Sequence, residues 1–429
     1  MILSRYELRA VGVEEILRRE AAVQTGVEAA VQQIMEDVRA RGDEALLAYT
    51  ERFDGVRPDP LAVTEEEFAA AEAAVAPELR AALGRAAANI EAFHRRQVRQ
   101  DLVTFGEDGV VLGQRFTPIA RAGLYVPGGT ASYPSSVLMN AIPARLAGVG
   151  EIVMTTPPQR DGTVAPLILV ASRLAGVTRV IRAGGAQAVA ALAFGTEQVP
   201  RVDKITGPGN IYVATAKRLV FGQVSIDMVA GPSEILVLAD ASADPVAAAA
   251  DLLSQAEHDR LSSAVLVTDS PDLADAVEAE LARQLPLLPR QDICRASLRA
   301  RGKILVSRDM DEALDAANRI APEHLELMVR DPFALLPRVQ NAGSVFLGHH
   351  TPEALGDYLA GPNHVLPTGG TARFSSPLSV DDFVKKTQFL YYTADALRRV
   401  KDDVAALAEA EGLRAHARSV GVRFAKEDT

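Results

Sequence analysis

Short runs of β-branched and other apolar residues alternate with helical patterns from residue 124 onward, and this alternation constrains the fold more than any other feature of the chain. The first series of strand-like runs covers residues 124–129, 151–157, 179–185, 202–209 and 224–229, with a helical stretch after each of the first four. Alternation of this kind predicts right-handed crossovers, and therefore a parallel sheet covered by helices.

A second series follows the first along the chain. Its expected strands are residues 234–240, 262–268, 303–307, 325–329 and 344–348, and its helical patterns cover 243–258, 271–284 and 310–320. A chain of 429 residues also exceeds the usual span of one hydrophobic core. The sequence therefore predicts the α/β class, with two Rossmann-like doubly wound units.

The two ends of the chain differ from this middle part. Apolar positions at helical spacing predict mainly helices in the first 120 residues, over 28–53 and 68–97. We expect His94, beside two arginines, to be a solvated histidine on a helix face. Past the Gly/Pro-rich stretch 360–377, residues 380–423 read as a small, charged helical tail.

Composition excludes several classes of function. The formal net charge of −11 opposes binding along a phosphate backbone, and no basic run interleaved with aromatic residues offsets it. No apolar stretch reaches the roughly 18 to 20 residues that span a bilayer, and the charged start does not read as a signal peptide. We therefore expect no nucleic-acid partner, no membrane partner and a cytoplasmic location.

The single cysteine, Cys294, excludes intramolecular disulfides and zinc sites built on several thiolates. Any metal must then be held by nitrogen and oxygen ligands. No histidine lies near Cys294 in the sequence, so we interpret it as a packing or surface residue without a catalytic role.

One loop has part of a dinucleotide-binding pattern. Gly207 and Gly209 follow a predicted strand, but Tyr212 stands where the third glycine of the Rossmann fingerprint would be. Asp227 lies at about the distance of an acidic ribose ligand, and a structural role suits it equally well, so it receives no assignment.

Gln255 and His258 stand three residues apart at the end of a helical pattern, which would present an amide oxygen and an imidazole on one face. Asp357 and His416 could complete a nitrogen and oxygen ligand set, although spacing alone does not show that the four meet.

Glu323 and His324 are adjacent and directly precede a predicted strand, where we expect α/β proteins to place catalytic groups. Such a pair can supply two bases of different strength. The alternative is a capped helix end with a partly buried histidine.

These motifs together resemble the histidinol dehydrogenase family. The resemblance rests on eight stretches that occur in the family's order, residues 122–149, 184–197, 202–218, 226–240, 251–259, 321–329, 351–370 and 411–423. The family's nucleotide unit likewise lacks the usual glycine fingerprint. The resemblance covers essentially the whole chain, because the helical N-terminal portion is compatible with it.

The resemblance implies a role for each matching residue, and none of the motif positions departs from the family pattern. It implies that zinc is held by Gln255, His258, Asp357 and His416, and that Glu323 and His324 are the acid/base pair. It implies NAD contacts at Tyr125, Gln187 and Asn210. It implies that the substrate is bound by Ser233, Gln255, His258, His324, Asp357, His364, Glu411 and His416.

The activity implied by the resemblance is the NAD-dependent, four-electron oxidation of L-histidinol to L-histidine through L-histidinaldehyde, the last step of histidine biosynthesis. The family implies one zinc ion per subunit and a homodimer with shared active sites. A zinc hydrolase that uses Glu323 to activate water, and a protein that binds nucleotide or metabolite without turnover, are the alternatives.

We divide the chain accordingly into four parts. These are an N-terminal helical segment over 1–22; a larger α/β domain over 23–124 with 234–377, carrying the metal and catalytic residues; an NAD-binding domain over 125–233; and a C-terminal dimerisation arm over 378–429.

Overall fold

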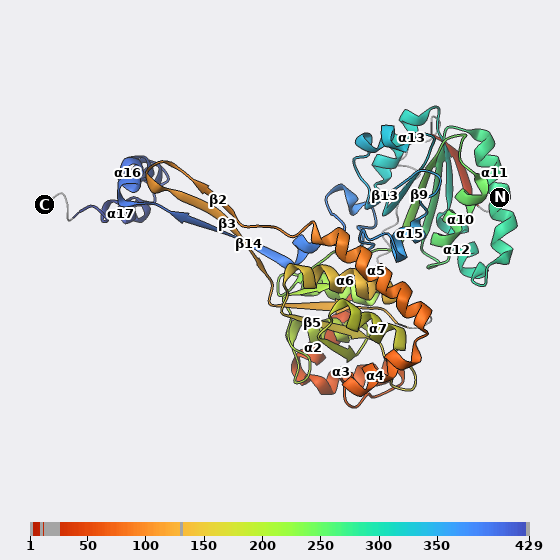
Figure 1. The fold of residues 1–429 in the computed structure, drawn as a ribbon, viewed down its shortest axis with the longest axis horizontal. Coiled ribbons are helices and arrows are strands. Elements are labelled where there is room, and N and C mark those ends of the chain that lie inside the picture. Colours follow the sequence, from red (N-terminus) through yellow and green to blue (C-terminus); the bar gives the residue numbers. More distant parts are fainter. Residues whose placement is uncertain (1–2, 9–11, 13–25, 129–131, 426–429) are drawn as a thin grey trace. The chain divides into compact units, whose positions relative to one another are not determined.

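The structure is a computed structural model that describes residues 3–8, 12, 26–128 and 132–425 (Figure 1). It divides into two compact units, one made of residues 1–97 and 119–383, the other of residues 98–118 and 384–429. No helix among the described residues is long and apolar enough to cross a membrane.

The first unit contains a five-stranded parallel sheet with the order β6-β5-β4-β7-β8. Its strands are β4 (Arg121–Tyr125), β5 (Glu151–Thr156), β6 (Arg179–Arg182), β7 (Lys204–Thr206) and β8 (Ser225–Ile226). The connecting helices are α6 (Pro134–Ala147), α7 (Pro166–Ala175), α8 (Gly185–Phe194) and α9 (Ile211–Val220). Ile152 and Met154 of β5 belong to one core cluster and Val153 to another, because successive side chains of a strand point to opposite faces. Helices therefore cover both faces of this sheet.

The same unit contains a six-stranded parallel sheet with the order β1-β11-β10-β9-β12-β13. Its strands are β1 (Ser4–Glu7), β9 (Glu234–Ala239), β10 (Ser263–Thr268), β11 (Lys303–Val306), β12 (His324–Met328) and β13 (Ser344–Leu347). Its helices are α10 (Pro245–Ala256), α11 (Pro271–Gln284), α12 (Gln291–Arg301), α13 (Met310–Ile320), α14 (Pro332–Leu335) and α15 (Glu353–Tyr358). Cys294 is buried in α12. Two parallel sheets covered by helices confirm the expected α/β class.

The N-terminal helices α2 (Val27–Arg41), α3 (Asp43–Asp54), α4 (Glu65–Ala74) and α5 (Pro77–Arg95) differ from the expected domain division. We grouped residues 23–124 with the six-stranded sheet. Instead, α2 packs against α8 and α9, α4 against α7, and α5 against α6. The apolar faces of α2 and α3 share a core with α8. These helices therefore pack with the five-stranded sheet and not with the six-stranded one. Most of the expected segment 1–22 lies outside the described residues, and its described part, Ser4–Glu7, is a strand, not a helix.

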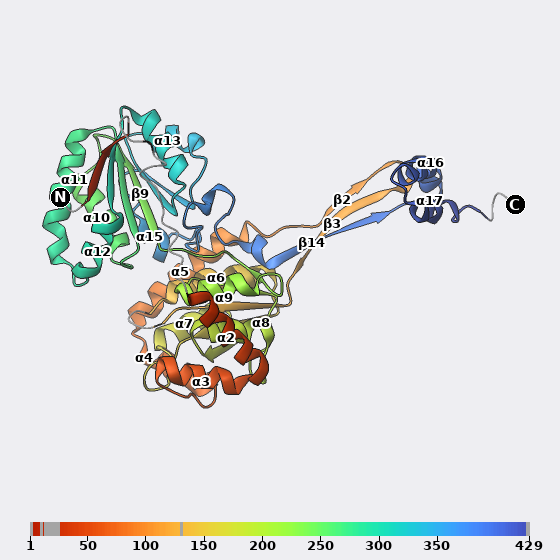
Figure 2. The same ribbon diagram turned by 180° about the vertical axis from the view of Figure 1, so that it is seen from behind.

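The second unit is a three-stranded antiparallel sheet with two helices (Figure 2). Strands β2 (Leu102–Phe105), β3 (Val111–Pro118) and β14 (Val384–Tyr391) are ordered β14-β3-β2, and α16 (Ala394–Ala410) and α17 (Arg414–Gly421) follow. Strands β2 and β3 lie outside the ranges predicted as helical, 28–53 and 68–97, whereas the expectation of helix was wrong for 384–391. The reason is that every residue of β14 pairs with a residue of β3. Short 3-10 helices occur at Glu107–Gly109, Leu285–Leu287, Leu336–Arg338, Thr371–Arg373 and Val380–Phe383.

Candidate active site

Glu323 and His324, the expected acid/base pair, lie at the amino edge of the six-stranded sheet. His324 is the first residue of β12 and is aligned with Ile235 of β9 and Ser344 of β13. Because these strands are parallel, their first residues share one edge. The sequence analysis expected this pair directly before a strand, and the structure agrees, because β12 begins at His324. Helix α10 runs back from the end of β9 and brings its C-terminal residues to the same amino edge.

The surroundings of His324 define its protonation. Its Nδ1 lies 2.9 Å from the backbone carbonyl oxygen of Glu234 and 3.1 Å from the Gln255 amide nitrogen, and a proton on Nδ1 satisfies the shorter contact, because the carbonyl can only accept. The opposite nitrogen, Nε2, is buried and has no hydrogen-bond partner among the described residues. Burial lowers the pKa of His324 to about 4, and the ring is therefore neutral at pH 7. Nε2 is thus a free base inside the protein.

Glu323 is held by the same residue of β9. The backbone N–H of Glu234 donates to Glu323 Oε2 at 2.8 Å. Burial, followed by repulsion from Glu234, Glu353 and Asp357, raises the pKa of Glu323 well above its usual value. The backbone of Glu234 therefore orients two adjacent groups of different base strength.

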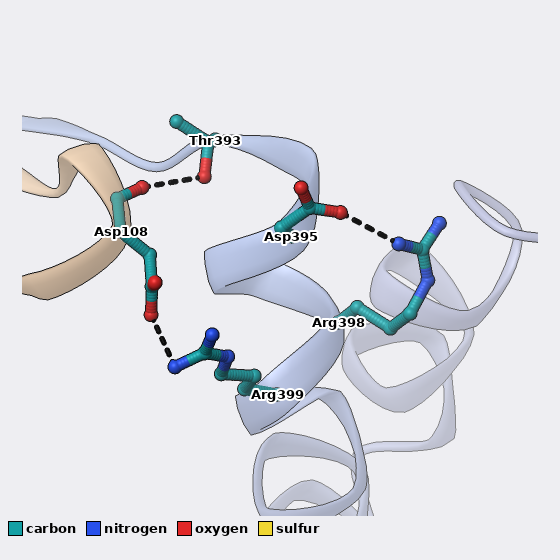
Figure 3. Close-up of a pocket in the computed structure, with 5 residues that line it drawn as sticks. All are labelled: Asp108, Thr393, Asp395, Arg398 and Arg399. Atoms are coloured by element: carbon teal, nitrogen blue, oxygen red, sulfur yellow. Dashed lines mark hydrogen bonds and ion pairs between the residues drawn. The ribbon is translucent and has the colours of Figure 1, made fainter.

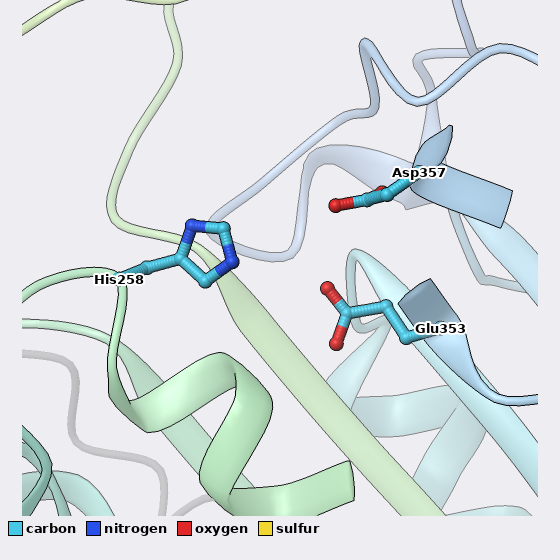
Figure 4. Close-up of side chains that lie close together, drawn as sticks. All are labelled: His258, Glu353 and Asp357. Atoms are coloured by element: carbon cyan, nitrogen blue, oxygen red, sulfur yellow. The ribbon is translucent and has the colours of Figure 1, made fainter. Parts of the chain in front are cut away.

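Three potential metal ligands converge beside this pair. One ligand atom each of His258, Glu353 and Asp357 lies within 4.8 Å of the others, and Figure 4 shows the three side chains pointing toward one another. His258 follows α10, and the two carboxylates come from successive turns of α15. The Nε2 atom of His324 lies 3.7 Å from Glu353 Oε1 and 4.0 Å from Asp357 Oδ1.

Gln255 extends the cluster. Its Nε2 lies 3.1 Å from His324 Nδ1, and its Oε1 is buried without a hydrogen-bond partner among the described residues. An orphaned amide oxygen beside an imidazole and carboxylates is a nitrogen and oxygen donor set that suits zinc. Three of the four residues that the resemblance implied as ligands, Gln255, His258 and Asp357, thus lie together in the first unit.

Glu353 is a residue that the sequence analysis missed. It stands four residues before Asp357, and this i, i+4 pair of carboxylates was the available signal. Its backbone N–H donates to Glu326 Oε1 at 2.8 Å. Burial raises the pKa of Glu353 and of Glu326 well above their usual values, and the pKa of the neighbouring Asp251 to about 6. A buried layer of carboxyl groups therefore connects α15 to β12.

A cavity of about 110 Å³ adjoins the cluster and is lined by His324, Asp357 and His364, among others. The Nε2 of His364 is buried and has no hydrogen-bond partner among the described residues. Ser233 directly precedes β9, at the same edge of the sheet. The other two residues implied for the substrate, Glu411 and His416, belong to the second unit, on the C-terminal side of α16 and within α17.

His94 is not solvated, and that expectation was wrong. It is fully buried on α5, with Nδ1 2.7 Å from Gln97 Oε1 and Nε2 3.4 Å from Asn363 Nδ2. Asn363 also donates to the carbonyl oxygen of Met139 at 2.7 Å. His94 therefore belongs to a buried network that anchors the loop carrying His364.

The three residues implied for NAD lie at the carboxyl edge of the five-stranded sheet. Tyr125 ends β4, Gln187 lies in the first turn of α8, and Asn210 caps the N-terminus of α9. The strand order reverses between β4 and β7, which is the position where doubly wound sheets bind ligands. The Tyr125 hydroxyl accepts from the Gly185 N–H at 3.1 Å, and the buried Gln187 Oε1 has no partner among the described residues. This edge is suited to hold a dinucleotide.

A larger hollow, of about 490 Å³, lies in the second unit and is lined by Asp108, Thr393, Asp395, Arg398 and Arg399 (Figure 3). Both arginines are neutralised, Arg398 by Asp395 at 2.9 Å and Arg399 by Asp108. These contacts fasten the start of α16 to the loop before β3, and the hollow contains none of the predicted site residues.

Comparison with known proteins agrees with this geometry. The family model for histidinol dehydrogenase matches residues 17–424. The chain is 58% identical over 412 residues to a histidinol dehydrogenase of Geobacter sulfurreducens, covering 95% of this chain and 96% of that one. It is 53% identical over 421 residues to the Bacillus cereus histidinol dehydrogenase, covering 98% of each chain.

Solved structures give the same result. A crystal structure of histidinol dehydrogenase from Elizabethkingia anophelis matches with a TM-score of 0.95 at 38% identity, covering 100% of this chain and 99% of that one. An acetylating aldehyde dehydrogenase from Geobacillus thermoglucosidasius, at 14% identity and a TM-score of 0.51, covering 86% of this chain and 97% of that one, shares the fold alone. The chain therefore belongs to the histidinol dehydrogenase family, a family of oxidoreductases.

Proposed function

We propose that this chain oxidises L-histidinol to L-histidine through L-histidinaldehyde, with zinc and NAD, as the last step of histidine biosynthesis. The observation that carries the proposal is the free, neutral Nε2 of His324, which faces a cluster of metal-ligand side chains in a buried site. A base of this kind can remove the proton of an alcohol, and the clustered ligands can hold the metal that positions the alcohol.

Gln255, His258, Asp357 and His416 would hold the zinc ion. When bound, zinc contributes no redox chemistry but grips the nitrogen atoms of the substrate and fixes its carbinol carbon in place. His364, whose Nε2 is buried without a partner among the described residues, lines the adjoining cavity and suits the polar end of the substrate. Ser233 and Glu411 complete the proposed substrate contacts.

In the first oxidation, His324 Nε2 takes the hydroxyl proton while a hydride leaves the carbinol carbon for NAD, which gives the aldehyde. Glu323 then takes a proton from water, whose oxygen adds to the aldehyde carbon, while His324 returns its proton to the aldehyde oxygen, which gives the hydrate and a neutral His324. In the second oxidation, His324 takes a hydroxyl proton of the hydrate as the second hydride leaves for NAD, which gives the carboxylic acid, and this acid ionises to the carboxylate. The raised pKa of Glu323 makes its carboxylate a stronger base than an exposed glutamate.

The nucleotide would bind at the carboxyl edge of the five-stranded sheet, in contact with Tyr125, Gln187 and Asn210. The orphaned Gln187 Oε1 supports this placement, because a buried acceptor without a partner is costly unless a ligand supplies a donor.

We further propose a homodimer in which His416 and Glu411 of the partner subunit complete each site. The second unit supports this, since it is small and exposes large apolar side chains, among them Phe105 (81% exposed), Leu390 (72%) and Leu407 (69%). A second copy of the chain would cover such a surface and bring the two site residues of α16 and α17 with it. The biosynthetic role places the enzyme in the cytoplasm.

The proposal is tested by mixing purified, zinc-loaded protein with NAD and histidinol and following NADH by its absorbance. We expect NADH to form, and His324→Asn to reduce its rate by about two to four orders of magnitude. A zinc hydrolase or a protein without turnover would produce no NADH, and that result would refute the proposal.

A further inference from the structure

A buried ion pair lies beside the loop of the five-stranded sheet where the nucleotide is proposed to bind. Lys217 of α9 pairs with Asp227, which follows β8, and their side chains are only 2% and 1% exposed. Removing two charges from water costs several kcal/mol per ion, so a buried pair is weak evidence for a role in stability alone. The hydrogen bonds of Lys217 and Asp227 indicate a different role for the pair.

Both members of the pair bind the backbone of one residue, Gly207. Lys217 Nζ donates to the Gly207 carbonyl oxygen at 2.8 Å, and the Gly207 N–H donates to Asp227 Oδ2 at 2.8 Å. The two side chains therefore hold the donor and the acceptor of the same residue, and they fix its orientation from both sides.

Gly207 is under tight geometric constraint. Its φ of +112° is a left-handed conformation that favours glycine, and a Cβ placed there would lie 2.0 Å from the carbonyl oxygen of Tyr125. The loop that begins at Gly207 leads to Asn210, whose Oδ1 accepts from the N–H groups of Tyr212 and Val213 at the start of α9. The ion pair thus fixes Gly207, which lies against the backbone of Tyr125 and begins the loop that leads to Asn210. Tyr125 and Asn210 are two of the residues proposed to contact NAD.

The carboxylate of Asp227 is fully engaged. In addition to Lys217 and the Gly207 N–H, it accepts the Met228 N–H at 2.6 Å on Oδ1. It is therefore not available to bind a ribose, although its distance from the glycine loop would suit that role in a Rossmann unit.

We infer that Lys217 and Asp227 are positioning residues for NAD, and that they act by clamping Gly207 so that the Gly207–Asn210 loop keeps the shape that the dinucleotide requires. This inference rests on the proposed function, because it assumes that NAD binds at this edge of the sheet. Neither side chain contacts the reacting atoms.

The test is the double variant Lys217→Met/Asp227→Asn, which removes the ion pair and the Lys217 hydrogen bond to Gly207 without leaving an unpaired charge in the core. Direct calorimetric binding to the zinc-loaded enzyme should show the Kd for NAD raised on the order of ten- to a hundred-fold, as expected for a misplaced binding group. The KM for NAD should rise in parallel, while the Kd for histidinol and the zinc content stay unchanged.

The chain offers a matched control in Lys204→Met/Asp382→Asn. Lys204 Nζ lies 2.9 Å from Asp382 Oδ1 and is also well buried, but Lys204 begins β7, at the end opposite Gly207. We expect the Kd for NAD of this control to remain at the wild-type value. An equal rise in both double variants would overturn the inference, because it would show a general effect of breaking an ion pair.

A folded clamp variant with the wild-type Kd for NAD would also overturn the inference. If Lys217→Met/Asp227→Asn does not fold, Lys217→Leu/Asp227→Asn decides in the same way, because its aliphatic side chain also cannot donate to the Gly207 carbonyl oxygen. Failure of the proposed function looks different, since the wild-type enzyme itself would then not bind NAD.

Discussion

At the scale of single residues, the backbone of Glu234 controls the chemistry of the site. Its carbonyl oxygen accepts from His324 and its N–H donates to Glu323, so one residue of β9 orients both members of the pair. Burial then acts on the two in opposite directions. It lowers the pKa of His324 to about 4 and raises the pKa of Glu323, since it disfavours the charged form of each.

The pair should divide the reaction between its members. Glu323→Gln should reduce kcat for oxidation of the aldehyde by about 10²-fold or more, because this half needs an activated water, and should reduce oxidation of the alcohol far less. His324→Asn should reduce both halves, because each one removes a hydroxyl proton. Steady-state rates with histidinol and with histidinaldehyde provide the comparison, and equal losses of Glu323→Gln on the two substrates would contradict the division.

His94 should make the stability of the first unit depend on pH. Burial lowers its pKa in the folded chain below the value of about 6.5 expected in the unfolded chain. Its contribution to stability is therefore complete above pH 6.5 and declines as the pH falls below that value, since the unfolded chain then binds a proton that the folded chain does not.

His94→Gln tests this by differential scanning calorimetry. At pH 7.5 the variant should melt about 1 °C lower, because Asn363 and Gln97 lose a buried partner worth about 1 kcal/mol. At pH 5.5 the difference from wild type should be smaller. A difference that stays constant between the two pH values would contradict the account.

The sequence predicted which residues gather in the site better than it predicted which side chains are buried. Five of the residues that it singled out are gathered in one cluster, namely Gln255, His258, Glu323, His324 and Asp357. It missed Glu353 and misplaced His94, because a helical pattern does not show which face a neighbouring loop will cover. His94 is buried because the loop with Asn363, which is distant in the sequence, packs against α5.

At the scale of elements, the site depends on where helices end. The C-terminal side of α10 brings Gln255 and His258 to the amino edge of the sheet, and the short helix α15 presents Glu353 and Asp357 one turn apart. An apolar core on one face of the six-stranded sheet holds α10, and the hydrogen bond from the Glu353 N–H to Glu326 Oε1 holds the start of α15 against β12. The scaffold of the site therefore does not depend on a metal for its core.

Zinc removal should consequently abolish turnover and leave the fold intact. After chelation, the far-UV circular dichroism spectrum should be nearly unchanged while NADH formation stops, and added zinc should restore activity. His258→Asn should behave like the chelated protein, with less than stoichiometric zinc by elemental analysis. Loss of secondary structure on chelation would argue that the metal is structural.

The parallel strands from residue 121 onward were predictable because most of them are continuous apolar runs buried on both faces, whereas β1 is polar and only partly buried. The antiparallel sheet was not, because β2 is exposed along its whole length and β14 is exposed over all but its first residue. Strands that bury so little show no alternation of apolar and polar residues. Their assignment depends on pairing between segments far apart in the sequence, such as β3 with β14.

At the scale of the whole molecule, the site residues are distributed over two units. Gln255, His258, Asp357 and the acid/base pair belong to the first, and Glu411 and His416 belong to the second, which carries few buried residues of its own. A domain this small is marginal by itself. The proposed dimer both covers the exposed apolar surface of the second unit and completes two equivalent sites.

Complementation between inactive variants tests the shared site. His416→Asn and His258→Asn subunits, when mixed, would form heterodimers with one site that holds both histidines and one site that holds neither. Random reassortment makes about half of the dimers mixed, so roughly a quarter of wild-type activity should return. If mass spectrometry shows that subunits have exchanged and no activity returns, each site is built within one chain.

The central claim is that one site performs two successive oxidations. Its most direct test is the stoichiometry of NADH formed per histidinol consumed when zinc-loaded enzyme converts a limiting amount of histidinol in excess NAD. We predict two NADH and one histidine for each histidinol, with no free aldehyde accumulating. One NADH per histidinol with accumulating aldehyde, or no NADH at all, would contradict the account.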